Sequence, residues 1–135
     1  MSAFITTPAF KYQYTRLHLD LYYKKLRYHF HNQTIVYGIQ CRITDMYYIG
    51  SSFDPRQRFR NHLITGHSSN AALRADILEY GLENISVYVF EIIQHPKGST
   101  YNSRRIALRQ LEQRYIDMFP REQLYNSINA QPSST

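Results

Sequence analysis

Three stretches of the chain combine β-branched and aromatic residues in runs that are typical of β-strands. The first two, Thr34–Cys41 and 46–51, are separated by the short connection 42–45 and predict a β-hairpin. The third, Ile85–Ile93, is apolar almost throughout and predicts a buried or central strand. Together the three stretches predict a small three-stranded antiparallel sheet.

Apolar spacing and capping residues predict three helices in the same part of the chain, over residues 55–65, 69–80 and 103–119. The first begins at Asp54-Pro55, because aspartate caps helix N-termini and proline fits the first turn. Helix-ending residues follow the three helices: Gly66, Gly81 and Pro120. The order β-β-α-α-β-α predicts an α+β domain over residues 34–130, with a sheet flanked by helices and a polar tail over 131–135.

Residues 1–33 form a basic, tyrosine-rich extension ahead of this domain, with a single acidic residue. Apolar side chains recur there at helical spacing and predict a helix over 16–30. Three alternating leucines also fit a strand: Leu17, Leu19 and Leu21. We prefer the helix.

Two interpretations fit this extension. In one, Leu19, Leu26 and Phe30 complete the core of the domain while the charged side chains face water. In the other, the extension is a nucleic-acid-binding arm, in which cations neutralise phosphates and tyrosines stack on sugars or bases. The basic residues of that arm would be Arg16, Lys24, Lys25 and Arg27.

Composition narrows the class of protein. The 135 residues suit one domain, and the net charge of +6 with a pI near 9.5 favours a polyanionic partner. An anionic membrane surface fits the charge equally well, but the sequence has no apolar run long enough to span a bilayer. The single cysteine, Cys41, excludes an internal disulfide and a cysteine-rich zinc site. With no secretory signal visible, we expect an intracellular protein.

Glu112 lies in an apolar stripe of the last predicted helix, one turn from Leu108, Tyr115 and Ile116. A carboxylate on the core side of a helix is unfavourable unless it is paired or bound to a metal. Glu112 is therefore either half of a structural ion pair with an arginine or a metal ligand.

Arg58 and His62 are four residues apart and share one face of their predicted helix, with Arg56 and Arg60 on other faces. Alone, such a helix surface is simply basic and solvated. Combined with Glu112 and with the tyrosines of the hairpin, it suits phosphodiester hydrolysis. Arginine neutralises charge on the phosphate, a carboxylate holds a divalent ion, and a phenol near either cation can act as a base.

These residues stand in motifs that resemble those of the GIY-YIG nucleases. Tyr48-Ile49-Gly50 reproduces the second tripeptide of the family name, and Ile35-Val36-Tyr37 keeps the tyrosine of the first. The eleven-residue step between the two tyrosines fits the family, as do the segments GSSFDPRQRFRNH, LEQRYI and LYNSINA. Two departures are the isoleucine that replaces the first glycine and Thr44-Asp45 in place of the usual Asn/Gly turn.

The resemblance implies a role for each polar residue of the motifs. Tyr37 would be the general base or would help to activate the attacking water, and Tyr48 would hold that water or the phosphate. Arg58 would bind the scissile phosphate, and His62 would assist proton transfer or phosphate binding. Glu112 would hold one divalent metal, Mg²⁺ or Mn²⁺.

Three further positions have supporting roles: Gly50, His67 and Asn126. Gly50 would let the backbone come close to a ligand, because glycine has no Cβ, and Asn126 would pack or hydrogen-bond beside the site. The residues expected to contact nucleic acid are Arg16, Lys24, Lys25, Arg27, Arg56 and Arg60.

The sequence thus predicts a metal-dependent DNA endonuclease, either homing-type or stand-alone. Two alternatives stay open: a structure-specific repair or recombination nuclease, and a non-catalytic basic nucleic-acid-binding module. Because one active site cuts one strand at a time, a double-strand break would need a homodimer on the DNA or two successive nicks.

Overall fold

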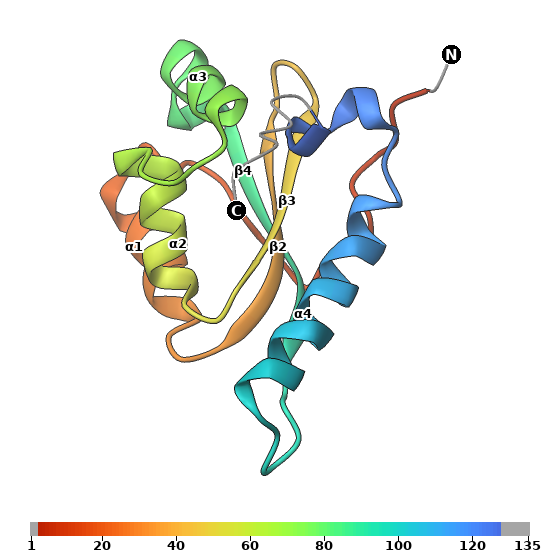
Figure 1. Ribbon diagram of the computed structural model, residues 1–135. Helices are drawn as coiled ribbons and strands as arrows, with labels where there is room; N and C mark the ends of the chain where they lie inside the picture. The colour runs from red at the N-terminus through yellow and green to blue at the C-terminus, as the bar shows by residue number, and fades with distance from the viewer. Residues whose placement is uncertain (1–2, 128–135) are drawn as a thin grey trace.

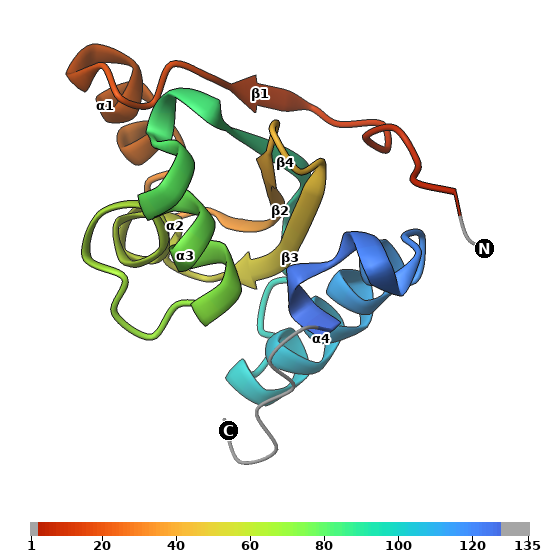
Figure 2. The same cartoon turned by 90° about the horizontal axis from the view of Figure 1, so that it is seen from above.

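The structure, a computed structural model, describes residues 3–127 and is built on one antiparallel sheet with the strand order β1-β4-β2-β3 (Figures 1 and 2). The strands β2 (Thr34–Cys41), β3 (Met46–Ser52) and β4 (Ile85–Ile93) lie where the sequence predicts them. The fourth strand, β1 (Tyr12–Tyr14), pairs with the outer edge of β4. The predicted count of three strands is therefore wrong, because a three-residue edge strand is too short to show an alternating pattern.

Residues 3–127 contain four α-helices: α1 (Asp20–His29), α2 (Pro55–Arg60), α3 (Ala71–Tyr80) and α4 (Tyr101–Ile116). A π-helical turn, Asn61–Thr65, extends α2 to its predicted end. Short 3₁₀ turns occur at Leu82–Asn84, Arg121–Gln123 and Tyr125–Ser127. Helix α4 starts two residues earlier than predicted, because the hydroxyl of Thr100 accepts a hydrogen bond from the Ser103 N–H and caps the helix there.

Helices cover both faces of the sheet. Successive side chains of a strand point to opposite faces, so Ile39 and Val87 pack toward α1, α2 and α3, whereas Ile49 and Phe90 pack toward α4. Figure 1 shows α1–α3 on one side of the strands and α4 on the other. Central strands that are buried on both faces carry apolar residues at nearly every position, which explains the continuous run in β4.

The N-terminal extension contributes to the core. Leu26 of α1 and Phe30, which directly follows the helix, are fully buried, as the first of the two interpretations requires. Leu19 is 43% exposed, because it precedes the first residue of α1. The helix starts later than predicted, since Arg16 has a left-handed backbone (φ 57°) that a right-handed helix cannot include.

Cys41 is a free thiol buried in the sheet. Within residues 3–127, every helix is too short or too polar to cross a membrane. The predicted polar tail, 131–135, lies outside the described residues.

Candidate active site

Tyr37 and Tyr48 point to the same face of the hairpin and are offset by two residues along the strands. Tyr37 pairs with Gly50, and Ile39 pairs with Tyr48. The two tyrosines are therefore diagonal neighbours, and their ring centroids are 6.5 Å apart. The register of the hairpin therefore sets both their common face and the distance between them.

Gly50 provides the space for the Tyr37 side chain. A Cβ atom on Gly50 would lie 2.5 Å from Tyr37 Oη and 2.6 Å from Tyr37 Cζ, far closer than van der Waals contact allows. The sequence predicts that this glycine admits a ligand, but the structure places the Tyr37 ring there instead. Glycine at this position therefore determines where the Tyr37 hydroxyl lies.

His62 is fully buried between two hydroxyl groups. Its Nε2 is 2.8 Å from Tyr37 Oη and its Nδ1 is 2.7 Å from Ser69 Oγ. Burial, assisted by the positive charge of Arg58, lowers the pKa of His62 to about 3. The ring is therefore neutral at physiological pH, donating through one nitrogen and accepting through the other.

The two tyrosine hydroxyls differ in access to solvent. Tyr37 is fully buried, whereas Tyr48 is partly exposed and lines a pocket. Burial raises the pKa of both phenols, and the nearby charge of Arg58 opposes that rise. Because burial outweighs the charge of Arg58, the pKa of each phenol stays above its usual value and both hydroxyls are protonated at neutral pH.

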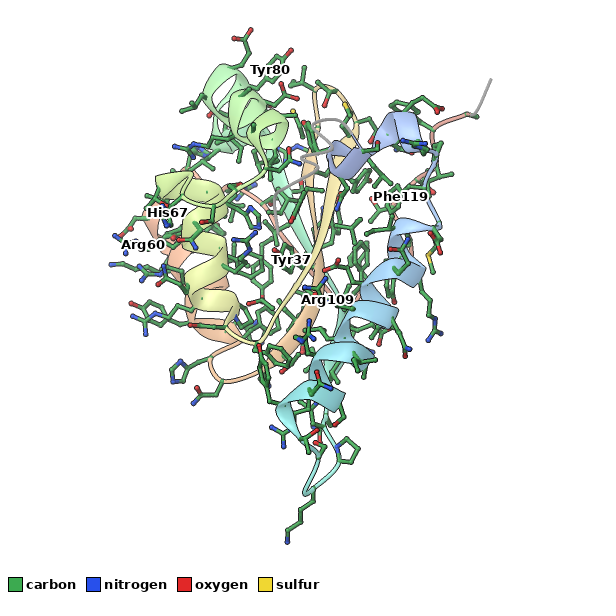
Figure 3. All side chains as sticks on the ribbon, viewed as in Figure 1. Tyr37, Arg60, His67, Tyr80, Arg109 and Phe119 are labelled. Atoms are coloured by element: carbon green, nitrogen blue, oxygen red, sulfur yellow. The ribbon has the colours of Figure 1, made fainter. Side chains whose placement is uncertain are left out.

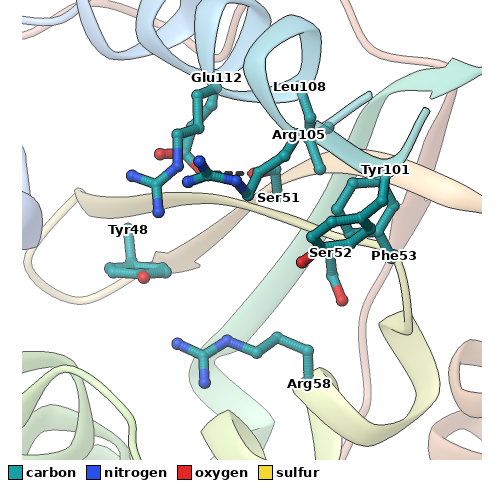
Figure 4. Close-up of a pocket in the computed structure, with 10 residues that line it drawn as sticks. Tyr48, Ser51, Ser52, Phe53, Arg58, Tyr101, Arg105, Leu108 and Glu112 are labelled. Atoms are coloured by element: carbon teal, nitrogen blue, oxygen red, sulfur yellow. Dashed lines mark hydrogen bonds between the residues drawn. The ribbon is translucent and has the colours of Figure 1, made fainter. Parts of the chain in front are cut away.

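This pocket, of about 300 Å³, opens at the outer edge of β3 (Figure 4). Because β3 is an edge strand, helices on opposite faces of the sheet can both reach its edge, and α2 and α4 form the two walls. The lining residues are Tyr48, Ser51, Ser52, Phe53, Arg58, Tyr101, Arg105, Leu108, Arg109 and Glu112.

Glu112 reaches the pocket from α4. Ser51 Oγ donates a hydrogen bond to its Oε1 at 2.6 Å. Burial raises the pKa of Glu112, while the Ser51 hydrogen bond and the charges of Arg109 and Arg58 oppose the rise. Across residues 3–127 the single salt bridge joins Lys24 to Asp20, so the structural ion pair that the sequence left open for Glu112 does not form there.

The donor set around Glu112 fits a magnesium-type ion. No group of three or more histidine, cysteine, aspartate or glutamate side chains that could hold a metal occurs in the described part of the chain. Mg²⁺ keeps several of its waters and binds through one or two carboxylates, so a single glutamate beside a hydroxyl supplies enough protein ligands. The same set is too small for zinc, which takes three or four protein ligands.

Two pocket arginines were missed at the sequence level. Arg105 and Arg109 line the pocket from the same helix as Glu112, and Arg109 points toward the strands in Figure 3. They precede Glu112 by seven and three residues, which places all three on one helical face. This spacing is visible in the sequence and could have predicted both arginines. Arg58 faces them from α2 and also donates to the Ser68 carbonyl at 3.0 Å.

Ser51 and Ser69 were also missed, since an isolated serine carries no sequence signal of its own. Asn126, which was predicted, supports β3 by accepting from the Ile49 N–H at 2.9 Å and donating to the Ile49 carbonyl at 2.7 Å. His67 is exposed and lies away from the pocket, on the outer side of the molecule in Figure 3. The structure therefore does not bring His67 to the site.

The predicted DNA-contacting residues do not line this pocket. Arg60 projects from the outer side of α2 in Figure 3. Arg16 and Lys25 lie on the ring of Tyr22, and Lys24 pairs with Asp20. The remaining two, Arg27 and Arg56, line a neighbouring pocket.

The pocket gathers three arginines beside a carboxylate and two tyrosines in an α+β fold, and guanidinium groups can bind phosphate oxygens through paired hydrogen bonds. Residues 33–126 match the family model of the GIY-YIG catalytic domain. Because this match covers more than half of the chain, the protein belongs to the GIY-YIG family and carries a nuclease domain of that type. No curated protein and no solved structure was found to match the chain.

Proposed function

We propose that the protein is a metal-dependent DNA endonuclease that hydrolyses phosphodiester bonds, as a stand-alone or homing-type enzyme. The observation that carries the proposal is the single pocket lined by Tyr48 of β3, Arg58 of α2 and Glu112 of α4. These elements are far apart in the sequence, yet together they supply the hydroxyl, the cation and the anion that phosphodiester hydrolysis requires.

Arg58 is the proposed ligand of the scissile phosphate, with Arg105 and Arg109 on the opposite wall. A guanidinium group can donate two parallel hydrogen bonds to a phosphate, which fixes its orientation as well as its position. Three arginines against one glutamate give the pocket a positive charge that attracts DNA.

The two tyrosines have different proposed roles in activating the attacking water. Tyr48 lines the pocket, and we assign it to the attacking water or the phosphate. Tyr37 is hydrogen-bonded to His62 behind it, and we assign this pair to proton uptake. When His62 Nδ1–H donates to Ser69, Nε2 carries no proton and accepts a hydrogen bond from the Tyr37 hydroxyl, so the lone pairs of Tyr37 Oη stay available to the attacking water.

Glu112 would hold the divalent cation, Mg²⁺ or Mn²⁺, with the Ser51 hydroxyl beside it. When bound, such a cation stabilises negative charge on phosphate oxygens. A cation would also favour the ionised form of Glu112, whose pKa burial raises in the free protein.

Nicking of a supercoiled plasmid tests the proposal. The wild type should nick only with Mg²⁺ or Mn²⁺ present, and Glu112→Ala should abolish nicking while it retains DNA binding, since the arginines remain. Glu122→Ala, which removes an exposed carboxylate far from the pocket, is the matched control and should nick normally. Near-normal nicking by Glu112→Ala would contradict the metal assignment. DNA binding without nicking by the wild type would instead indicate a non-catalytic binding module.

The basic residues outside the pocket are proposed to bind the DNA backbone. The set predicted from the sequence is Arg16, Lys24, Lys25, Arg27, Arg56 and Arg60. Their support is the charge of +6 and the position of α1 beside α2, which carries Arg58.

A further inference from the structure

A second pocket, of about 440 Å³, lies where the end of α1 meets the start of α2. Its lining residues are Arg27, His31, Asn32, Phe53, Asp54, Arg56 and Gln57. Phe53 also lines the candidate active site, so the two pockets share one wall. In Figure 4 the Phe53 ring lies against Tyr101 at the edge of the active-site pocket, with the ring centroids 5.5 Å apart.

Two arginines of this second pocket are held in place without acidic partners. Arg56 lies over the ring of Tyr28 at 4.6 Å from its centroid, and Arg27 lies 5.5 Å from the same centroid. Arg56 Nη2 also donates weakly to Tyr28 Oη at 3.4 Å. Neither arginine has a salt bridge within residues 3–127. The aromatic ring therefore positions both guanidinium groups and leaves their charge uncompensated.

Arg27 also has an unsatisfied donor. Its Nε is buried and has no hydrogen-bond partner among the described residues. Buried donors are nearly always paired, because leaving one unpaired is unfavourable by the full desolvation penalty of the group. The uncompensated charges of the two guanidinium groups that line the pocket indicate a site for an anionic acceptor.

The one acidic residue of the pocket, Asp54, is engaged with its own helix. Its side chain accepts a hydrogen bond from the Gln57 N–H and caps the N-terminus of α2. Two arginines against one such carboxylate leave the pocket positive, and further polar groups come from His31, Asn32 and Gln57.

We propose that this second pocket binds a phosphate of the DNA strand that flanks the scissile phosphodiester; the inference rests on the proposed nuclease function. A strand whose scissile phosphate lies beside Arg58 carries its neighbouring phosphates past the Phe53 wall. A guanidinium pair in a shaped pocket holds one of them and so sets the register of the strand. The extension thus acts on DNA through Arg27 in a defined pocket with α2, in addition to any general charge attraction.

Binding of a short fluorescein-labelled DNA duplex in EDTA, measured over a range of salt concentrations, tests this inference. Arg27→Gln and Arg56→Gln should each weaken binding several-fold and reduce the slope of log affinity against log salt by about 0.9, the value for one lost phosphate contact. Arg121→Gln is the matched control. This variant also removes one positive charge, but from an exposed turn that follows the C-terminal end of α4 (Figure 1). The slope of log affinity against log salt should change less in Arg121→Gln than in the two pocket variants.

The outcomes separate this inference from the proposed function. If wild-type protein binds DNA but both pocket variants behave like Arg121→Gln, the flanking-phosphate site is overturned and the nuclease proposal stands. If the wild type binds no DNA at any salt concentration, both proposals fail. If Arg27→Gln does not fold, the Arg56→Gln variant tests the inference by itself. Arg56 lies on α2 and not on the N-terminal extension, and the melting temperature of that variant shows whether it is folded.

Discussion

At the scale of single residues, the two motif tyrosines differ although the register of the hairpin places them on the same face. Tyr48 meets the pocket, whereas Tyr37 is enclosed by Gly50 and His62. Two neutral hydroxyl groups, one on each side of His62, fix the orientation of its ring. The chemistry proposed for this site therefore depends on a buried hydrogen-bonded chain as well as on the exposed groups.

Removing either hydroxyl should preserve the fold and impair cleavage. We expect Tyr37→Phe and Tyr48→Phe each to lower the single-turnover nicking rate by about 10²–10⁴-fold, the usual range for general acid–base groups. Tyr88→Phe is the control, since it loses a buried hydroxyl hydrogen-bonded to Gln40 away from the pocket and should cut normally. Wild-type rates in both motif variants would mean that these tyrosines serve only the core.

The neutral state of His62 predicts a pH dependence of stability. Its pKa is about 3 in the folded protein, whereas an unfolded histidine titrates near 6.5. Between these values the unfolded chain binds the extra proton. The free energy of unfolding should therefore fall with falling pH below about 6.5, by at most ~1.4 kcal/mol per pH unit from this group.

Urea denaturation of the wild type and of His62→Gln, from neutral pH to about pH 5, measures this effect. The variant is expected to be less stable at neutral pH but to lose less stability on acidification. The other histidines and the carboxylates are common to both proteins. Equal pH slopes in the two proteins would contradict a neutral, buried His62.

At the scale of elements, the edge strand β3 carries the site and is supported from outside the sheet. Its free edge faces the C-terminal turn, where Asn126 both donates to and accepts from the backbone of Ile49. The asparagine side chain thus replaces a neighbouring strand at one residue pair. An unsupported edge would leave these backbone groups unpaired and the strand free to shift.

Asn126→Asp should destabilise the protein by about 1–3 kcal/mol, because a carboxylate then faces the Ile49 carbonyl oxygen in place of a donor. The variant keeps the acceptor for the Ile49 N–H, so the loss reports the carbonyl contact. Asn102→Asp, in the exposed first turn of α4, is the control and should not destabilise. Unchanged stability of Asn126→Asp in chemical denaturation would show that the contact does not hold β3.

At the scale of the whole molecule, α2 and α4 lie on opposite faces of the sheet and meet only around the free edge of β3. This arrangement explains how residues 48, 58 and 112 come to line one pocket. Each chain is proposed to contain one such active site, and one site contacts one scissile phosphate at a time.

A plasmid time course should therefore show nicked circles accumulating before linear DNA appears, with an initial rate proportional to protein concentration. Each nick is an independent event of one chain, and a linear product needs a second nick nearby. Gel electrophoresis of the products at several protein concentrations measures both features. Direct conversion to linear DNA, with a rate that rises as the square of the concentration, would show two copies acting together.

Much of the fold was predictable because its signals are local. The β2 and β4 boundaries were predicted in full, and β3 to within one residue, since β-branched and aromatic runs bounded by turns identify strands. The cap at Asp54-Pro55 was confirmed for the same reason. Strand β1 and the late start of α1 were missed, because they depend on pairing with β4 and on the left-handed backbone at Arg16.

The spacing of the sequence motifs identified the family, and it singled out Arg58 and Glu112 among the charged groups that line the pocket. The tertiary structure was needed to show that both tyrosines share one face, that Tyr37 fills the space above Gly50 and that Ser69 holds His62. It also placed Arg105 and Arg109 opposite Arg58, and it joined α1 to α2 around the second pocket. These features depend on strand register and on packing between elements far apart in the chain, which no local pattern encodes.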